Sequence, residues 1–299
     1  MNVKLRTAPG DLIFNVFLYT FMLCIGIVTI YPFLNVLAIS LNDSIDTVRG
    51  GIYLRPRIFT LENYKQIFMY NNLIIAFQNS VIRTLVGTLL GIFSSSMIAF
   101  VLSRKDFIAR KQVSLFFVLT LYFSGGLIPS YMLMRDLNLI NTFWVYVLPG
   151  LVNAWNVFVV RSYMDGLPYS LQESAKLDGA SDLTIFFKII LPLCKPVLAT
   201  IGLFISVGQW NSWFDTYLYN STEAHLTTLQ YELMKILSNT QAGASSDISR
   251  LGDSSISNKV SPESIRAAIT IVATLPILLV YPFLQKYFVK GLTLGAVKS

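Results

Sequence analysis

Charged residues are scarce in this sequence of 299 residues. Asp, Glu, Lys and Arg together make up 13% of the chain, whereas hydrophobic residues make up 54%. Soluble domains carry about a quarter charged residues. The apolar residues also gather in repeated runs of about 20, the length that an α-helix needs to cross a bilayer. The composition therefore argues against a soluble globular protein and predicts an all-α polytopic membrane protein.

Side chains that commonly serve catalysis or metal binding are few as well. His225 is the only histidine, and neither a GxSxG motif nor metal-ligand spacing surrounds it, so we expect a solvated loop residue. Cys24 and Cys194 lie in or beside apolar runs without a CxxC partner, which supports neither a disulfide nor a metal site. The chain has no GxxxxGKS/T phosphate loop. The sequence thus predicts a non-catalytic chain without a metal or cofactor of its own, so that any ATP is bound elsewhere.

Six apolar runs predict six transmembrane helices within a single transmembrane domain that covers residues 1–299. The expected spans are about 12–41, 73–102, 113–134, 143–164, 190–218 and 265–289. The first run is too long for the core of a signal peptide and should remain as a span. Polar loops are expected at 42–72 and 219–264, and the second of these is rich in Ser, Asn and Asp between Ser238 and Ser261.

The distribution of basic residues predicts the orientation of the chain. If the N-terminus is inside, the inner segments hold thirteen basic and six acidic residues, whereas the outer segments hold nine basic and ten acidic ones. The positive-inside rule therefore places both termini and the segment 165–192 in the cytoplasm. The excess of basic residues on the inner side of the bilayer accounts for the net charge of +7, so no nucleic acid partner is expected.

The segment between the fourth and fifth spans predicts two short helices joined by a turn. Ser170 stands three residues before Glu173, the spacing of a capping box at a helix start. Gly179 permits a positive φ and hence a sharp turn. Ser181 or Asp182 can cap the second helix. This stretch is the most distinctive motif of the chain.

Three blocks within that stretch resemble the Glu-Ala-Ala loop of ABC importer permeases. They are Glu173-Ser174-Ala175, Asp178-Gly179-Ala180 and Ile189-Ile190-Leu191-Pro192, with Ser174 in place of the usual first Ala. Other segments are similar to the carbohydrate-uptake (maltose-type) branch of these permeases: 31–35, 59–64, Asn79-Ser80 and 291–298. Within that branch the sequence is most similar to subunits that import complex oligosaccharides or polysaccharides, alginate importers among them.

The resemblance implies a set of partners in a bacterial cytoplasmic membrane. They are a second homologous permease chain, a dimer of ATP-binding cassette ATPases that holds ATP and Mg, and an extracytoplasmic sugar-binding protein. It also implies which residues couple this chain to the ATPase: Glu173, Ser174, Ala175, Asp178, Gly179, Ala180 and Pro192.

Two alternatives stay open. The stretch could be an ordinary capped helix-turn-helix, and the chain could be an ion- or proton-coupled secondary carrier, for which an inverted repeat or broken helices, together with an intramembrane carboxylate, are expected.

Polar residues inside the spans are candidates for the substrate path. Arg83 is costly within a membrane, so it should line a wet path, join a polar network with Gln78 and Asn79, form a structural salt bridge, or snorkel to the surface. The other candidates combine amides with indoles, which suit sugar hydroxyls and C–H faces: Asn153, Asn156, Gln209, Trp210 and Asn211. Nearby Trp155, Trp213 and Asp215 share this chemistry, although a Trp belt with interhelical hydrogen bonds would explain it equally. Gly87 and Gly91 favour close helix packing.

Overall fold

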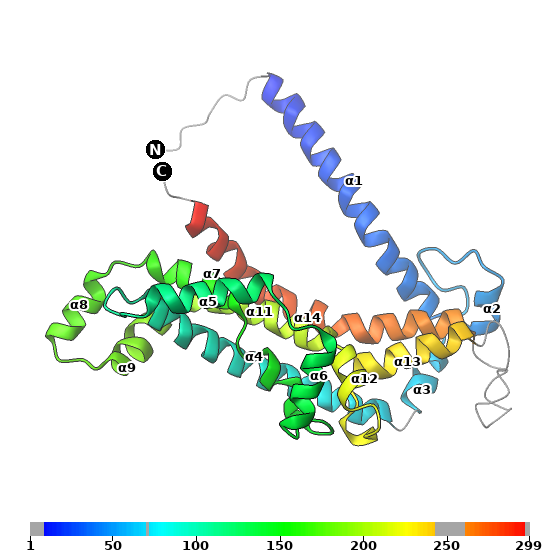
Figure 1. Cartoon of the computed structure of the whole chain (residues 1–299). Coiled ribbons are helices and arrows are strands. Elements are labelled where there is room, and N and C mark those ends of the chain that lie inside the picture. The colour runs from blue at the N-terminus through cyan, green and yellow to red at the C-terminus, as the bar shows by residue number, and fades with distance from the viewer. Residues whose placement is uncertain (1–8, 70–71, 243–260, 297–299) are drawn as a thin grey trace. The chain divides into compact units, whose positions relative to one another are not determined.

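A computed structural model describes residues 9–69, 72–242 and 261–296 (Figure 1). The described residues form helices and loops and contain no named strand, as expected for an all-α protein. The chain divides into two compact units. The first comprises Met1–Tyr70 and Leu237–Thr274, and the second comprises Asn71–Ile236 and Leu275–Ser299.

Among the described residues, three helices are individually long and apolar enough to cross a membrane. They are α1 (Pro9–Ser40), α4 (Asn72–Ser103) and α14 (Pro262–Ala296). Their apolar stretches cover Gly10–Ser40, Leu73–Ser103 and Pro262–Val280. These helices correspond to the first, second and sixth expected spans.

The other three expected spans are bent rather than continuous. Helix α5 (Arg110–Tyr122) meets α6 (Leu127–Asp136) at 118°, and the 3-10 turns η1 (Phe143–Tyr146) and η2 (Leu148–Gly150) meet α7 (Ala154–Asp165) at 48°. The segment from α9 (Asp182–Ile185) through the π-helical turn η3 (Phe186–Ile190) to α10 (Leu191–Leu193) meets α11 (Lys195–Asn211) at 80°. Counting each bent pair as one span gives up to six spans.

Each bend has a local cause in the sequence. Gly126 has φ 85°, a conformation open to glycine, between α5 and α6. Asn153 begins α7 in an extended conformation and caps it with its own side chain. Pro192 and Pro196 fall on either side of the third bend, where the missing N–H groups interrupt the helical ladder. Hydropathy alone could not detect these interruptions.

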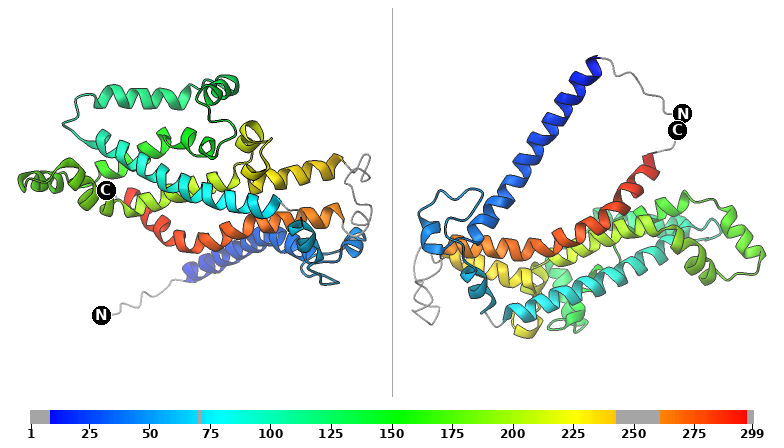
Figure 2. Two further views of the ribbon diagram at one scale, coloured as in Figure 1. Left: turned by 90° about the horizontal axis from the view of Figure 1, so that it is seen from below. Right: turned by 180° about the vertical axis from the view of Figure 1, so that it is seen from behind.

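The second unit is built on α4, which packs lengthwise against α7 and α11 (Figure 2). Glycines allow the close approach: a Cβ atom on Gly87 would lie 2.9 Å from the Gln209 side chain, and one on Gly91 would lie 3.1 Å from Ile205. This confirms the expected packing role of Gly87 and Gly91. The half of the unit that contains the end of α4 and the start of α11 holds a cluster of buried apolar residues, among them Phe100, Val160, Phe186 and Ile201.

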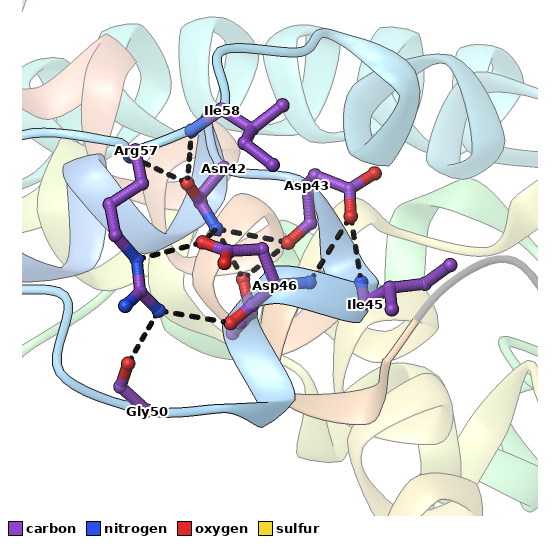
Figure 3. Close-up of polar contacts among 8 residues, drawn as sticks. Asn42, Asp43, Ile45, Asp46, Gly50, Arg57 and Ile58 are labelled. Atoms are coloured by element: carbon purple, nitrogen blue, oxygen red, sulfur yellow. Dashed lines mark hydrogen bonds and ion pairs between the residues drawn. The ribbon is translucent and has the colours of Figure 1, made fainter.

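Helices occur within both of the segments that we expected to be polar loops. In the first unit, α2 (Ser44–Val48) contributes Asp46 to a polar cluster around Asn42 (Figure 3), and Asn63 of α3 (Glu62–Phe68) donates to Asn42 O at 2.8 Å. The Asn42 side chain donates to Asp43 O, Asp46 and Thr47 and accepts from the N–H groups of Arg57 and Ile58. The second segment contains η4 (Ala224–Leu226) and α13 (Leu229–Ala242), whereas α12 (Phe214–Tyr219) lies at the end of the expected fifth span. The Ser-rich part from 243 to 260 lies outside the described residues.

Candidate functional site

The segment 170–185 forms the expected pair of short helices, with a different start from the one expected. Helix α8 (Ser170–Leu177) begins at Ser170, and Tyr169 precedes it without a side-chain cap. The capping box of Ser170 and Glu173 was therefore a wrong prediction. Pro168 O and Tyr169 O already accept from Leu171 and Gln172, so the first turn starts before Ser170 and its hydroxyl is no longer at the capping position.

Gly179 makes the turn between the two helices. Its φ is 78°, its N–H donates to Lys176 O at 3.0 Å, and the N–H of Ala180 donates to Ala175 O at 2.9 Å. These two bonds form a Schellman motif, in which a residue with positive φ ends the helix. Ser181 then caps α9 by accepting from Thr184 N at 3.3 Å, as expected for one of the two candidate caps. The glycine therefore sets the direction in which α9 leaves α8.

The candidate coupling residues differ in exposure. Ala175 is buried and Ala180 is half-buried, so these two face the body of the unit. The others are exposed: Glu173, Ser174, Asp178, Gly179 and Pro192. Within the described part of the chain, the Glu173 carboxylate makes no hydrogen bond or ion pair. In Figure 1, α8 and α9 project beyond the end of α4, where a partner can reach the exposed side.

A pocket of about 590 Å³ lies among α4, η1, α7, α11 and α12 of the second unit. It brings together four of the six residues predicted for the substrate path: Arg83, Asn153, Asn156 and Gln209. Aromatic side chains share the lining, among them Tyr146, Trp155 and Tyr219. Trp210 and Asn211 do not line it. Trp210 is buried against Phe77 in an edge-to-face contact, and Asn211 accepts from Gln230.

Arg83 is the centre of a polar network in the pocket wall. Its Nη1 donates to Asp215 Oδ1 at 3.2 Å, and its Nη2 forms an ion pair with Asp215 Oδ2. Its Nε and Nη2 donate to Gln209 Oε1 at 3.1 and 3.0 Å. The guanidinium also lies 4.5 Å from the centroid of the Tyr146 ring. With only 2% of its surface exposed, Arg83 is a buried, fully engaged cation that fixes the wall of the pocket.

This network selects among the alternatives for Arg83. The structural salt bridge is present, with Asp215 as the partner, and the side chain does not snorkel to the surface. The expected network with Gln78 and Asn79 was wrong, because Asn79 donates instead to the carbonyls of His225 and Thr227. The His225 side chain itself is exposed beside Glu223, as expected for a loop residue. Asp215 lies 132 positions from Arg83 along the chain, and no local pattern could pair them.

Two of the lining residues remain available for a ligand. Asn156 is 8% exposed, and its side-chain amide has no hydrogen-bond partner within the described part of the chain. Trp155 is 61% exposed and presents an indole at the same pocket. Asn153 uses its Oδ1 to cap α7, since it accepts from Asn156 N at 3.1 Å. An amide without a hydrogen-bond partner beside an exposed indole ring suits a ligand with hydroxyl groups and an apolar face.

Comparisons with known proteins match the chain along nearly its whole length. It matches the family described as "Binding-protein-dependent transport system inner membrane component" over residues 6–294. The polygalacturonan/rhamnogalacturonan transport system permease protein YtcP of Bacillus subtilis is 38% identical over 292 residues, which cover 96% of this chain and 99% of that protein. The arabinooligosaccharides transport system permease protein AraQ of Bacillus subtilis is 30% identical over 306 residues, which cover 99% and 100%.

A solved structure shares the fold. It belongs to a bacterial ABC transporter involved in the import of the acidic polysaccharide alginate, and it superimposes with a TM-score of 0.84 at 25% sequence identity. The match covers 95% of this chain and 100% of that chain.

Proposed function

The chain belongs to the family of binding-protein-dependent transport system inner membrane components, and we propose that it forms half of the translocation path of an ATP-driven importer of oligosaccharides or polysaccharide fragments. Full-length similarity to sugar permeases carries this proposal. Such permeases are transport subunits, which agrees with a non-catalytic role. The chain is an inner-membrane protein with several membrane-spanning segments.

In this proposal the pocket is the part of the path that this chain contributes. Arg83, Gln209 and Asp215 hold the wall, and the amide of Asn156 and the indole of Trp155 contact the passing sugar. A buried polar group that pairs with a ligand discriminates strongly, because the pair is lost when the ligand lacks the matching hydroxyl. The contact remains weak overall because the pocket is open, which suits a site that must release its cargo.

Coupling to ATP hydrolysis is assigned to α8 and α9. The free carboxylate of Glu173 would pair with a basic residue of an ATPase partner, which binds ATP and Mg. The Gly179 turn would hold α8 and α9 in the relative orientation that the ATPase surface requires. A second permease chain would complete the path, and a sugar-binding protein would deliver the cargo from the outer side. Both termini and this helix pair are then cytoplasmic.

A secondary carrier fits less well, although two of its expected features are present. The chain contains bent spans and a carboxylate, Asp215, in a pocket. Asp215 is already engaged by Arg83 and by Thr216 N, so it is not free to bind a coupling ion or carry a proton. The family match also favours the ATP-driven importer.

The proposal can be tested with the complex that copurifies with the tagged chain, reconstituted in vesicles with its binding protein. Uptake of polygalacturonan fragments and arabino-oligosaccharides is measured against sugar concentration. Asn156→Ala and Trp155→Ala should each raise KM about tenfold, because each removes a contact of roughly 1–2 kcal/mol. Trp213→Ala is the matched control, since Trp213 packs on Phe214 and Tyr217 and does not line the pocket. Unchanged KM in both pocket variants would place the sugar elsewhere, and ATP hydrolysis indifferent to any oligosaccharide would overturn the assignment of a sugar importer.

A further inference from the structure

Four charged residues connect the end of α4 to both helices of the α8–α9 pair. Arg104 follows the last residue of α4, Asp106 lies in the connection to α5, Lys176 is on α8, and Asp182 is the first residue of α9. Arg104 donates to Asp182 Oδ1 from Nη1 at 2.8 Å. It also donates to both oxygens of Asp106, from Nε at 2.9 Å and from Nη2 at 2.8 Å.

The chain of contacts continues from Asp106 to α8. Lys176 Nζ donates to Asp106 Oδ2 at 2.8 Å. The order Lys176, Asp106, Arg104, Asp182 therefore bridges the two helices on opposite sides of the Gly179 turn, through an element outside the pair. The Schellman turn fixes the backbone at one point, whereas this bridge holds the helices at a second point.

Arg104 is the member that is held in place. Its side chain is 7% exposed, whereas those of Asp106, Asp182 and Lys176 are 49%, 66% and 40% exposed. Its guanidinium lies 5.6 Å from the centroid of the Phe100 ring, one turn earlier on the chain. A planar fork with several donors can serve two carboxylates at once, which a lysine ammonium at this position would do with poorer geometry.

We propose that Arg104 is a positioning residue for coupling: it locks α8 and α9 to the end of α4, so that movement of the helix pair is passed to the transport path. This inference rests on the proposed function. Helix α4 is continuous over Leu73–Ser103 and carries Arg83 in the pocket wall 21 positions before Arg104. At 1.5 Å per residue, the two arginines are about 32 Å apart along one helix. Expected spans three, four and five are bent, whereas α4 runs unbroken from the pocket wall to the residue before Arg104.

We call the contacts of Arg104 with Asp106 and Asp182 the Arg104 clamp. The clamp is first tested by distance measurement in the full chain, in lipid nanodiscs without an ATPase. Spin labels are placed at Ile108 and Leu183 in one sample and at Ile108 and Leu177 in another, after replacement of Cys24 and Cys194. The three labelled positions are 96%, 62% and 89% exposed, so labels should be tolerated. Arg104→Gln should broaden the 108–183 distances more than the 108–177 distances, because the Lys176–Asp106 pair remains. Lys176→Gln should do the reverse.

The second test measures coupling in the reconstituted complex, without labels. Arg104→Gln and Asp182→Asn should each lower the sugar imported per ATP hydrolysed by about fivefold, the lower end of usual coupling between sites. The double variant should be no worse than Arg104→Gln, because both changes remove the same bond. Arg104→Lys should restore part of the ratio. Arg135→Gln is the control, since it breaks an exposed pair with Asp136 elsewhere in the unit.

Different failures have different meanings. The clamp would be overturned if Arg104→Gln left the spin-label distance distributions narrow and unchanged and also left the sugar imported per ATP hydrolysed unchanged. Additive losses in the double variant would also contradict it, because the two residues would then act separately. If Arg104→Gln does not fold, Asp182→Asn decides alone, since that side chain is exposed. A wild-type complex that imports no sugar would instead count against the proposed function, while the distance measurement would still judge the clamp.

Discussion

Arg83 offers the sharpest test of the pocket wall, through the substitution Arg83→Met. Methionine fills much of the volume of the arginine stem and removes every donor of the guanidinium. Gln209 Oε1 loses both of its Arg83 donors. Asp215 keeps the N–H of Thr216, at 2.9 Å, and loses its ion-pair partner.

The expected loss of stability can be worked out from these contacts. Breaking a buried ion pair by removing one partner costs about 3–5 kcal/mol. Because the Asp215 side chain is 22% exposed, water can solvate part of its charge, so we expect the lower end, about 3 kcal/mol. That is roughly a hundredfold rise in the unfolded fraction. Arg83→Met with Asp215→Asn should cost only about half as much, because no unpaired charge is left.

The assay is unfolding of the purified chain in dodecyl maltoside micelles by titration with SDS, followed by tryptophan fluorescence. All four tryptophans lie between positions 144 and 213, within the unit that contains Arg83. The fluorescence therefore reports on that unit. A free energy of unfolding for Arg83→Met within about 0.5 kcal/mol of wild type, or a double variant less stable than Arg83→Met alone, would refute the assignment of Arg83 and Asp215 as a structural pair.

Three further predictions concern other parts of the chain. Gly202→Val should destabilise the second unit by about 1–3 kcal/mol in the same titration, because a Cβ there would lie 2.9 Å from Ile92 Cδ1, whereas Gly208→Val on the same helix, with nothing within 4 Å, should have no such effect. Asn42→Ala should speed tryptic cleavage after Arg57, since the N–H groups of Arg57 and Ile58 lose their acceptor; cleavage at the wild-type rate would contradict the role of Asn42. Arg104 and then Lys176 hold the pKa of the Asp106 carboxyl well below its ordinary value. The stabilisation that the ionised carboxylate gives to its pairs with Arg104 and Lys176 is therefore complete above about pH 4, and it is lost only as the pH falls through the lowered pKa. Coupling should therefore be flat in pH between about 5 and 8, and Asp106→Asn should lower it equally across that range; a loss near neutral pH in wild type would be inconsistent with this pairing.

The sequence predicted the local structure correctly where a single residue determines the backbone conformation. Gly179 has the positive φ that its place between two helices predicted, and Ser181 caps α9. Spans one, two and six correspond to long apolar helices, because hydropathy over about 20 residues needs no tertiary information. The capping box failed because Pro168 and Tyr169 start the turn earlier, a competition between neighbouring starts that the spacing of Ser170 and Glu173 does not show.

The remaining features depend on contacts between distant residues. The pairing of Arg83 with Asp215 and the clamp of Arg104 on Asp182 join positions 132 and 78 residues apart. Helices α2, α3 and α13 are short or polar, so the composition of their segments indicated loops. Trp210 was chosen for its chemistry, yet it faces Phe77 and not the pocket, because adjacent residues on a helix point about 100° apart and Gln209 already faces the pocket. Sequence patterns name candidate side chains, and the packing of α4, α7 and α11 decides which of them meet.

The most direct test of the coupling assignment is the substitution Gly179→Val in the reconstituted complex. A Cβ at Gly179 meets nothing within 4 Å, so its cost is backbone strain alone, about 1–3 kcal/mol at φ 78°. Gly51→Val, at φ 74° and equally open, is the matched control, and it lies in the segment between α2 and α3, away from the α8–α9 pair. Sugar uptake and ATP hydrolysis are measured in the same vesicles. We predict that Gly179→Val is present at a normal level but loses sugar-coupled hydrolysis, more severely than Glu173→Ala, while Gly51→Val keeps it. Full coupled transport by Gly179→Val would show that the α8–α9 segment is only a loop, and would contradict its role in coupling.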